Sequence, residues 1–184
     1  MASPYVVPVA HLLRTTPASA HVAFEAPFDP NGEFEPRGPV ETDVDPLEPV
    51  RVDLTLQSFS GGVHARGSIE TTWHGVCRRC SVVVRGALVL QVVERFVESP
   101  GPEDEEAYSL EHDALDLAPL VHDSILLELP LAPLCRPDCR GLCPVCGQDR
   151  NEVECDCAAP LDPRWATLDG LLGDDSVSTP EGDD

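Results

Sequence analysis

Val50-Arg51-Val52-Asp53-Leu54-Thr55-Leu56 is the stretch of sequence that decides the fold, because apolar and polar residues alternate along it. Successive side chains of a β-strand point to opposite faces, so this period of two predicts a strand with one buried face. A turn at Gly61-Gly62 follows, and the alternation resumes, less strictly, from Val63 to Trp73. The Val-rich stretch from Ser81 to Val97 is predicted to be a further strand. The connections are too short for crossover helices, so we expect antiparallel pairing.

One main helix is predicted after these strands. Asp116 is the expected N-cap, Pro119 is tolerated in the first turn, and the helix should run to about Leu129. Five residues fall at helical spacing, so the face that they form can lie on the sheet; they are Leu117, Leu120, Val121, Ser124 and Ile125. We therefore expect an α+β fold, with an antiparallel β-sheet, one main helix and a C-terminal cysteine-rich zinc-binding module.

Five segments are predicted along the chain. They are an N-terminal strand and turn segment (1–26), an acidic Pro-rich loop (27–49), the antiparallel sheet plus helix (50–134), the cysteine-rich zinc module with a short helix (135–172) and a disordered acidic tail (173–184). The short helix should begin at Asp162-Pro163-Arg164-Trp165, and Trp73 and Trp165 are expected to be core aromatics. Loops 27–49 and 98–113 and the tail should be mobile, because net charge and proline content prevent burial.

The charge balance excludes some partners. Among 184 residues there are 33 Asp and Glu against 12 basic residues, all of them Arg, which gives a formal charge of -21. This argues against a broadly basic surface for nucleic acid and against docking on anionic lipid. No run approaches the ~18 apolar residues that a membrane-spanning helix needs. No secretory signal is visible at Met1–Tyr5, so we expect a cytoplasmic protein whose thiols stay reduced.

Eight cysteines are the most informative residues for function. In a reducing compartment, closely spaced pairs such as Cys143-Pro144-Val145-Cys146 favour metal binding over disulfides. Zinc prefers four tetrahedral ligands, so eight thiolates predict two structural Zn²⁺ ions with no position for a catalytic water. The predicted ligands are Cys77, Cys80, Cys135, Cys139, Cys143, Cys146, Cys155 and Cys157. Gly147 can supply the positive φ that such a tight turn often requires.

The assignment of the ligands to two sites is open between two arrangements. In the favoured one, Cys143, Cys146, Cys155 and Cys157 close a local site, and Cys77 and Cys80 combine with Cys135 and Cys139. In the other, the two CxxC pairs join as in a zinc ribbon. His74, three residues before Cys77, is a further candidate ligand, but a surface or core position is favoured for it.

Several ordered motifs carry a family resemblance. They are Cys77-Arg78-Arg79-Cys80, then Ser124-Ile125-Leu126-Leu127-Glu128-Leu129-Pro130, then Cys139-Arg140-Gly141-Leu142-Cys143-Pro144-Val145-Cys146-Gly147, and finally Asp162-Pro163-Arg164. Over roughly 50–172 the chain resembles the YceD family of large ribosomal RNA subunit accumulation proteins. The resemblance implies a role in 23S rRNA accumulation and large ribosomal subunit biogenesis. Because closed four-thiolate sites leave no catalytic position, we expect a non-enzymatic factor. The implied partner is the large-subunit precursor, through its 23S rRNA or a ribosomal protein, with no membrane and no small-molecule substrate.

A local excess of Arg marks the expected contact with RNA or another partner. The candidate contact residues are Arg78, Arg79 and Arg85, since the planar guanidinium fork binds phosphate bidentately. The simpler alternative is that Arg78 and Arg79 only offset the charge of a four-thiolate zinc site. Two rival functions are a thiol-disulfide oxidoreductase using Cys77 and Cys80, and a zinc-ribbon adaptor of the transcription machinery. No βαβ pattern surrounds the CxxC motif, which argues against the oxidoreductase.

Overall fold

The computed structural model describes residues 3–32, 42–101, 107–158 and 164. The chain divides into two compact units, residues 1–139, which contain the sheet, and residues 140–184. Apart from Arg164, the short helix predicted from Asp162 and the predicted acidic tail lie outside the described residues, and so does Trp165. The division into five segments stays a prediction.

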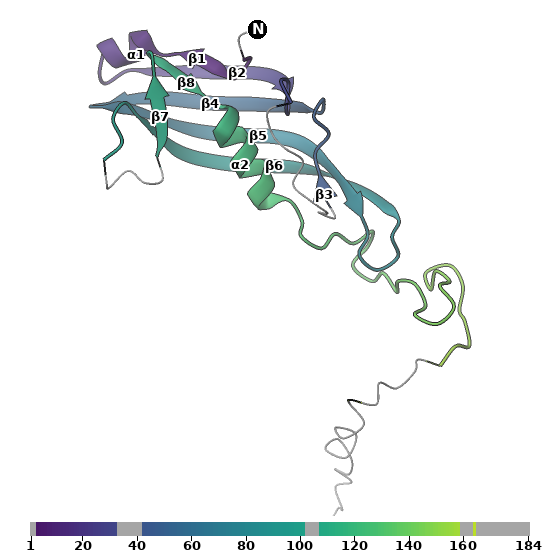
Figure 1. Cartoon of the computed structure of the whole chain (residues 1–184). Helices are drawn as coiled ribbons and strands as arrows, with labels where there is room; N and C mark the ends of the chain where they lie inside the picture. Colours follow the sequence, from purple (N-terminus) through teal and green to yellow (C-terminus); the bar gives the residue numbers. More distant parts are fainter. Residues whose placement is uncertain (1–2, 33–41, 102–106, 159–163, 165–184) are drawn as a thin grey trace, which may run out of the picture. The chain divides into compact units, whose positions relative to one another are not determined.

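An eight-stranded sheet dominates the first unit (Figure 1). Its strands are β1 (Val6–Pro8), β2 (Ser19–Pro27), β3 (Thr42–Asp43), β4 (Pro49–Phe59), β5 (Gly62–Val76), β6 (Val83–Val97), β7 (Tyr108–Glu111) and β8 (Ala114–Asp116). The order across the sheet is β1-β8-β7-β6-β5-β4-β2, and β3 pairs with β5. Two helices accompany the strands, α1 (Ala10–Arg14) and α2 (Ala118–Glu128). The described residues are thus mostly β-sheet, and the helical part is minor.

The predicted meander of β4, β5 and β6 is confirmed. Both pairings are antiparallel, and β5 stays in register with β6 from Gly62↔Val97 to Val76↔Val83. The prediction of a purely antiparallel sheet is wrong, because β7 runs parallel to β6, with Phe96 opposite Tyr108 and Val97 opposite Ser109. The parallel overlap is only two residue pairs long.

The loops predicted at 27–49 and 98–113 are partly wrong. In the second, Tyr108 and Leu110 alternate toward the interior as strand β7, and His112-Asp113, both with positive φ (53° and 58°), makes the tight turn into β8. In the first, Phe28 and Val44 are buried in the core. These apolar residues stand alone inside acidic or proline-rich stretches. No periodic pattern in the sequence therefore predicted that they would be buried. Residues 33–41 and 102–106 lie outside the described part of the chain.

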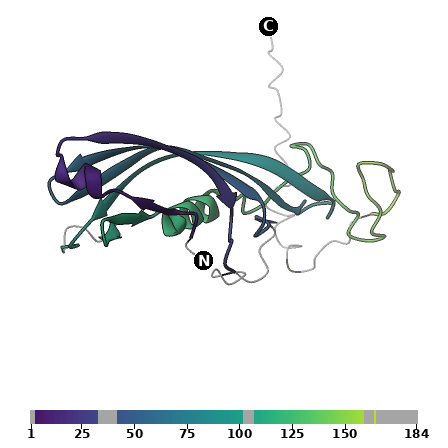
Figure 2. The same cartoon turned by 90° about the horizontal axis from the view of Figure 1, so that it is seen from above.

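Helix α2 covers one face of the sheet (Figure 2). Of its predicted apolar face, Leu120, Val121 and Ile125 are buried in one core with residues of β4 and β5, whereas Ser124 is half-buried. Each such large side chain contributes roughly 1.5–3 kcal/mol when fully buried. Pro119 lies in the first turn as predicted, but Asp116 ends β8, and its carboxylate accepts the N–H of Ala118 (3.0 Å). The N-cap position itself falls on Leu117.

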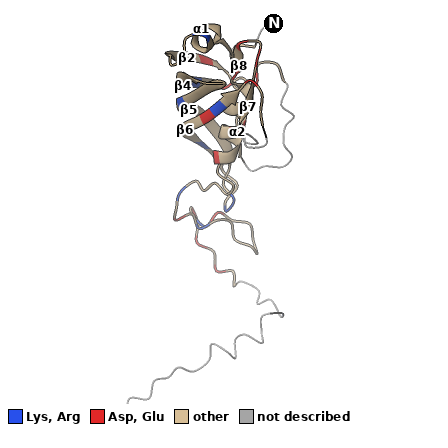
Figure 3. Cartoon of the chain, turned by 90° about the vertical axis from the view of Figure 1, so that its left-hand side faces the viewer, with Lys and Arg blue, Asp and Glu red and all other residues tan. Residues whose placement is uncertain are grey.

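On the face of the sheet opposite α2, charged residues of both signs are exposed, and Figure 3 colours the positions of Arg, Asp and Glu along the ribbon. Arg51 lies 3.7 Å from a carboxylate oxygen of Glu25 and 3.5 Å from one of Glu70. Such exposed pairs contribute about 0–1 kcal/mol each, so they affect solubility more than folding. Trp73 belongs to the other face, where it is half-buried against the core. Neither helix of the described residues is long and apolar enough to cross a membrane.

Candidate metal centre

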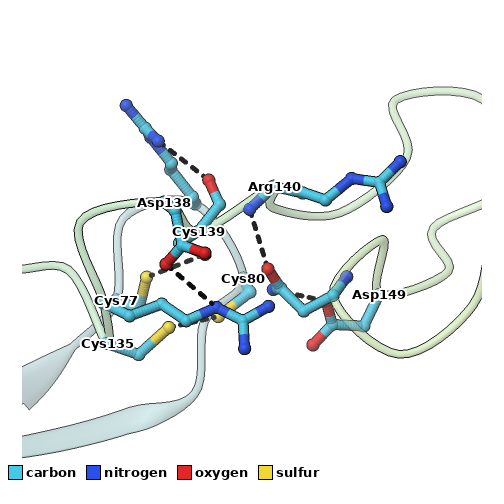
Figure 4. A network of polar contacts seen from close by, with 10 residues as sticks. Cys77, Cys80, Cys135, Asp138, Cys139, Arg140 and Asp149 are labelled. Carbon is cyan, nitrogen blue, oxygen red and sulfur yellow. Dashed lines mark hydrogen bonds and ion pairs between the residues drawn. The ribbon is translucent and has the colours of Figure 1, made fainter.

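The first cysteine group joins the β5–β6 turn to the segment after α2. Cys77 and Cys80 lie in the turn between the two longest strands, as predicted, and Cys135 and Cys139 come from the strap that follows α2, which we define as residues 130–139. The four sulfurs lie within 4.8 Å of one another, and Figure 4 shows the side chains directed toward a common point. Cys77, Cys80 and Cys139 are buried, and the half-buried side chains of Val84 and Leu134 pack against them.

The sulfur spacing suits a metal ion. The Sγ atoms of Cys77 and Cys139 are 3.8 Å apart, and those of Cys80 and Cys135 are 3.6 Å apart. A tetrahedral shell with Zn–S bonds of ~2.3 Å places its sulfurs about 3.8 Å apart. A disulfide would bring two sulfurs to ~2.05 Å, and all eight cysteines are free thiols. The donor set therefore fits a tetrahedral metal ion.

The second group lies in the second unit. The sulfurs of Cys143, Cys146, Cys155 and Cys157 also lie within 4.8 Å of one another. The structure thus brings the cysteines together in the first of the two predicted arrangements. His74 belongs to neither group; it is exposed on β5 opposite Arg85.

The two CxxC turns share one backbone pattern. The N–H of Cys77 donates to the carbonyl of Val82 and that of Ser81 to the carbonyl of Cys77, each at 2.8 Å. In the second unit, Cys143 donates to Gln148 (2.8 Å) and Gly147 to Cys143 (2.9 Å). The residue after the second cysteine has positive φ in both turns, 59° at Ser81 and 74° at Gly147. This pattern leaves other turn N–H groups directed at sulfur, such as that of Val145 at 3.5 Å from Cys143 Sγ.

These N–H groups favour thiolates at one cysteine of each group. Burial raises the pKa of Cys77, but the N–H groups of Cys135, Cys80 and Arg79 outweigh it and lower the pKa to about 6. The N–H groups of Cys146 and Val145 lower the pKa of Cys143 to about 6 as well. The turn geometry of each group therefore favours ionisation of one of its cysteines.

Other thiols in the two groups resist ionisation. Burial and the neighbouring thiols Cys139 and Cys80 raise the pKa of Cys135 to about 12. The Cys146 thiol, followed by burial, raises the pKa of Cys157 to about 12. Adjacent thiolates repel one another, so four of them can coexist only around a cation, and binding must release protons. Metal affinity should accordingly fall as the pH is lowered.

Gly147→Ala is expected to weaken metal binding by the second group about fivefold to tenfold. A Cβ at this position meets no atom within 4 Å, so the cost arises from the positive φ alone, about 1 kcal/mol. Val145→Ala is the control, because it changes an exposed side chain and keeps the N–H that donates to Cys143. Competition with a chromogenic chelator measures both variants. Equal affinities would show that the turn does not need the left-handed conformation.

The three predicted contact arginines have different surroundings. Arg79 donates a guanidinium N–H to the carbonyl of Cys139 at 2.8 Å, so it fastens the CxxC turn to the strap. Arg78 uses its backbone N–H for the carbonyl of Pro133 (3.0 Å), and its side chain is exposed. Arg85, near the start of β6, is also exposed. The geometry therefore leaves the side chains of Arg78 and Arg85 directed to solvent and gives Arg79 a bond inside the unit.

Arg79→Gln should accelerate metal loss from the first group about fivefold, whereas Arg78→Gln should leave it unchanged. Both changes remove one positive charge beside the same thiolates, but only the first removes the bond to Cys139, worth about 1 kcal/mol at an exposed site. Metal release to excess chelator measures the difference. If both variants lose metal equally fast, charge compensation is the role of these residues.

Some supporting residues were not identified from the sequence. The hydroxyl of Thr42 donates to the carbonyl of Pro130 (3.0 Å) and ties the start of the strap to β3. In the second unit, the N–H of Arg140 donates to Asn151 (2.7 Å), whose own N–H donates to the carboxylate of Asp149 (2.8 Å). The Asp149-Arg150-Asn151 order is typical of a side-chain-stabilised turn and was the available signal.

Comparisons with known proteins identify a family and several relatives. The family described as "Large ribosomal RNA subunit accumulation protein YceD" matches residues 65–172, a stretch that includes all eight cysteines. The uncharacterized protein Rv2926c of Mycobacterium tuberculosis is 36 % identical over 130 residues, which cover 68 % of this chain and 63 % of that protein. The match therefore spans less than two thirds of the length of that relative.

Two further relatives extend the match. The uncharacterized protein ML1660 of Mycobacterium leprae is 31 % identical over 143 residues, covering 73 % of this chain and 64 % of its own length. YlbN of Bacillus subtilis is 29 % identical over 155 residues, covering 82 % of this chain and 90 % of its own length. No solved structure matches this chain. Because the family match covers more than half of the sequence, the chain belongs to the YceD family of large ribosomal RNA subunit accumulation proteins.

Proposed function

We propose that this protein is a non-enzymatic, cytoplasmic factor that supports 23S rRNA accumulation and large ribosomal subunit biogenesis, with two structural zinc ions. The observation that carries the proposal is the family match over residues 65–172 together with two cysteine tetrads inside that stretch. The family's description supports the ribosomal role, and the sulfur geometry supports the metal.

The two tetrads suit zinc and do not suit Mg²⁺ or Ca²⁺. A shell of four thiolates is soft and tetrahedral, which excludes Mg²⁺ and Ca²⁺, and a closed shell leaves no open position for a substrate or water. The ion would supply charge neutralisation for the thiolates and a cross-link between segments. Cys77 and Cys139 are 62 residues apart in sequence, so such a cross-link would hold the strap against the end of the meander.

The surface around the first tetrad is the proposed contact with the ribosomal particle. Arg78 and Arg85 are exposed there in a chain of charge -21. Their planar guanidinium groups suit phosphate oxygens of 23S rRNA or carboxylates of a ribosomal protein. Arg79 is a poorer candidate, since its guanidinium already bonds the Cys139 carbonyl.

Two observations disfavour the rival functions. A catalytic thiolate must reach its disulfide substrate, but Cys77 is only 1 % exposed and faces three other thiols. A zinc-ribbon adaptor would join the two CxxC pairs, whereas Cys77 and Cys80 lie with Cys135 and Cys139.

Depletion of the protein in growing cells should lower the ratio of 23S to 16S rRNA, and the wild-type chain should restore it. The Arg78→Gln/Arg85→Gln variant should hold two zinc ions but co-sediment less with large-subunit precursors at low salt, and the difference from wild type should narrow as salt rises, because the lost contacts are electrostatic. Arg14→Gln, an exposed change of the same charge type in α1, is the control. An unchanged rRNA ratio on depletion would refute the ribosomal role. A zinc-replete double variant that co-sediments like wild type would refute the arginine contact alone.

A further inference from the structure

Strand β6 has a long edge without a strand partner. It pairs with β5 along its whole length but with β7 only at Phe96 and Val97. Within the described residues, nothing pairs with the other edge of β6 from Val83 to Val93. Every second residue of that stretch directs its N–H and C=O away from β5. A row of such backbone groups is a template for another strand.

A groove runs beside this edge. It has a volume of about 330 Å³ and lies between residues 89–94 of β6 and three residues of α2, namely Ser124, Leu127 and Glu128. Leu127 is 84 % exposed, and Val89 and Val93 are exposed as well. The edge strand at the other end of the meander, β2, is fully described and carries no exposed large apolar side chain. The β6 edge therefore combines unpaired backbone with apolar surface, a combination typical of a binding site.

The helix side of the groove is acidic. From Tyr108 to Leu129 the chain has five acidic residues and neither Arg nor Lys. Glu94 and Glu128 line the groove itself. Burial is the main cause that raises the pKa of Tyr108 to about 12, and the negative charges of Asp123 and Glu94 add to it. Both acids therefore lie near Tyr108, at the start of β7. The local charge thus has the sign of the whole chain, -21.

We propose that the β6 edge binds an extended, cationic segment of a partner protein as an additional strand in the groove beside α2. Backbone hydrogen bonds to β6 supply affinity. Basic residues at alternate positions of the segment point to the α2 side, where their aliphatic stems lie against Leu127 and their charges meet Glu94 and Glu128. The apolar residues between them point to the opposite face, beside Val89 and Val93. This inference rests on the sheet edge and goes beyond the proposed function.

Two other occupants fit less well. A second copy of this chain would bring the same acidic rim and a charge of -21 against its own, which opposes edge-to-edge pairing. A nucleic acid would place phosphates against carboxylates, and its backbone cannot continue a β-ladder. The edge and the rim together favour a basic polypeptide.

A nine-residue synthetic peptide of alternating Val and Lys, labelled for fluorescence anisotropy, tests the proposal with the full-length protein. Two N-methylated versions, one for each alternating set of amides, keep the charge and remove the hydrogen bonds on one side of the peptide strand. We expect one version to bind like the parent and the other to bind more than tenfold more weakly, because it loses several hydrogen bonds of about 0.5–1.5 kcal/mol each. Amide hydrogen exchange should slow at residues 83–93 when the parent peptide binds.

Leu127→Lys and Leu131→Lys form a matched pair of variants. Both leucines are highly exposed, 84 % and 87 %, so neither change should affect folding, but only Leu127 lines the groove. The first variant should weaken peptide binding about tenfold and the second less than twofold.

Four results would overturn the proposal. If both N-methylated peptides bound as tightly as the parent, backbone hydrogen bonds would not contribute, and the peptide would be held by charge attraction alone. Slow exchange of the outward amides of residues 83–93 in the protein alone, as a monomer, would mean that the chain itself covers the edge. If these amides exchanged slowly only at concentrations at which the protein dimerises, a second copy of the chain would be the molecule that binds the β6 edge. Displacement of the peptide by RNA, with equal loss in both leucine variants, would place the peptide elsewhere.

Discussion

The Cys139→Ser protein is expected to hold one metal ion where the wild type holds two, and its sheet unit should lose at least about 3 kcal/mol of unfolding free energy. Cys139 is buried within the first tetrad, and its carbonyl accepts the bond from Arg79. Loss of the metal would release the strap at residues 130–139 from the β5–β6 turn, and structural zinc contributes folding energy directly. Native mass spectrometry counts the ions, and calorimetry follows the unfolding transition.

Cys143→Ser provides the matched control. It should also remove one ion, but from the second tetrad, whose four cysteines all lie in residues 143–157. Proteolysis should then cut first beyond residue 139, while residues 50–97 stay protected and the sheet transition stays in place. If Cys143→Ser lowered the sheet transition as much as Cys139→Ser, the ribbon pairing of the two CxxC motifs would be correct instead. An apo protein with two or more disulfides after anaerobic preparation would contradict metal binding altogether.

Gly67→Ala should destabilise the sheet by about 4 kcal/mol or more. Gly67 lies in the middle of β5, opposite Leu54 of β4, with φ at +154°. A Cβ there would overlap the carbonyl oxygen of Asp53 and lie 2.9 Å from the Cα of Leu54. Both neighbours are backbone atoms of a paired strand, so relief requires the two strands to separate. Urea unfolding followed by circular dichroism measures the change.

Gly61→Ala distinguishes this clash from backbone conformation. Gly61 also has positive φ (+93°), but a Cβ there meets no atom within 4 Å. Its substitution should therefore cost only about 1–2 kcal/mol. If Gly67→Ala cost no more than Gly61→Ala, the close approach of β4 and β5 at Asp53 would be wrong.

Repeating patterns in the sequence were sufficient for the central architecture. The alternation from Val50 to Leu56 and the Val-rich stretch to Val97 predicted three paired strands with Cys77 and Cys80 at a turn, and the structure confirms this. The spacing of Leu117, Leu120 and Ile125 predicted the buried face of α2. These features depend only on residues two to four positions apart, so they can be predicted from the local spacing of apolar residues.

Pairing between distant segments was not determined locally. The sequence left two arrangements of the eight cysteines open, because each CxxC pair presents the same two ligands to a metal. The path of α2 and of the strap after Pro130 decides that Cys135 and Cys139 reach Cys77. The parallel β6–β7 pairing and the strand at Tyr108 likewise depend on where the chain returns after Val97.

The chemistry of the cysteines was therefore determined by the sequence, and their partners by the tertiary structure. Eight thiols at close spacings and two CxxC turns supply donor atoms that fit a metal ion in either arrangement of the cysteines. The bond from Arg79 to Cys139 and the unpaired edge of β6 exist only in the folded unit. The physical reason is that a local pattern fixes which way a side chain points relative to its own strand or helix. Only the packing of the whole core, around residues such as Leu54 and Ile125, fixes which distant backbone it meets.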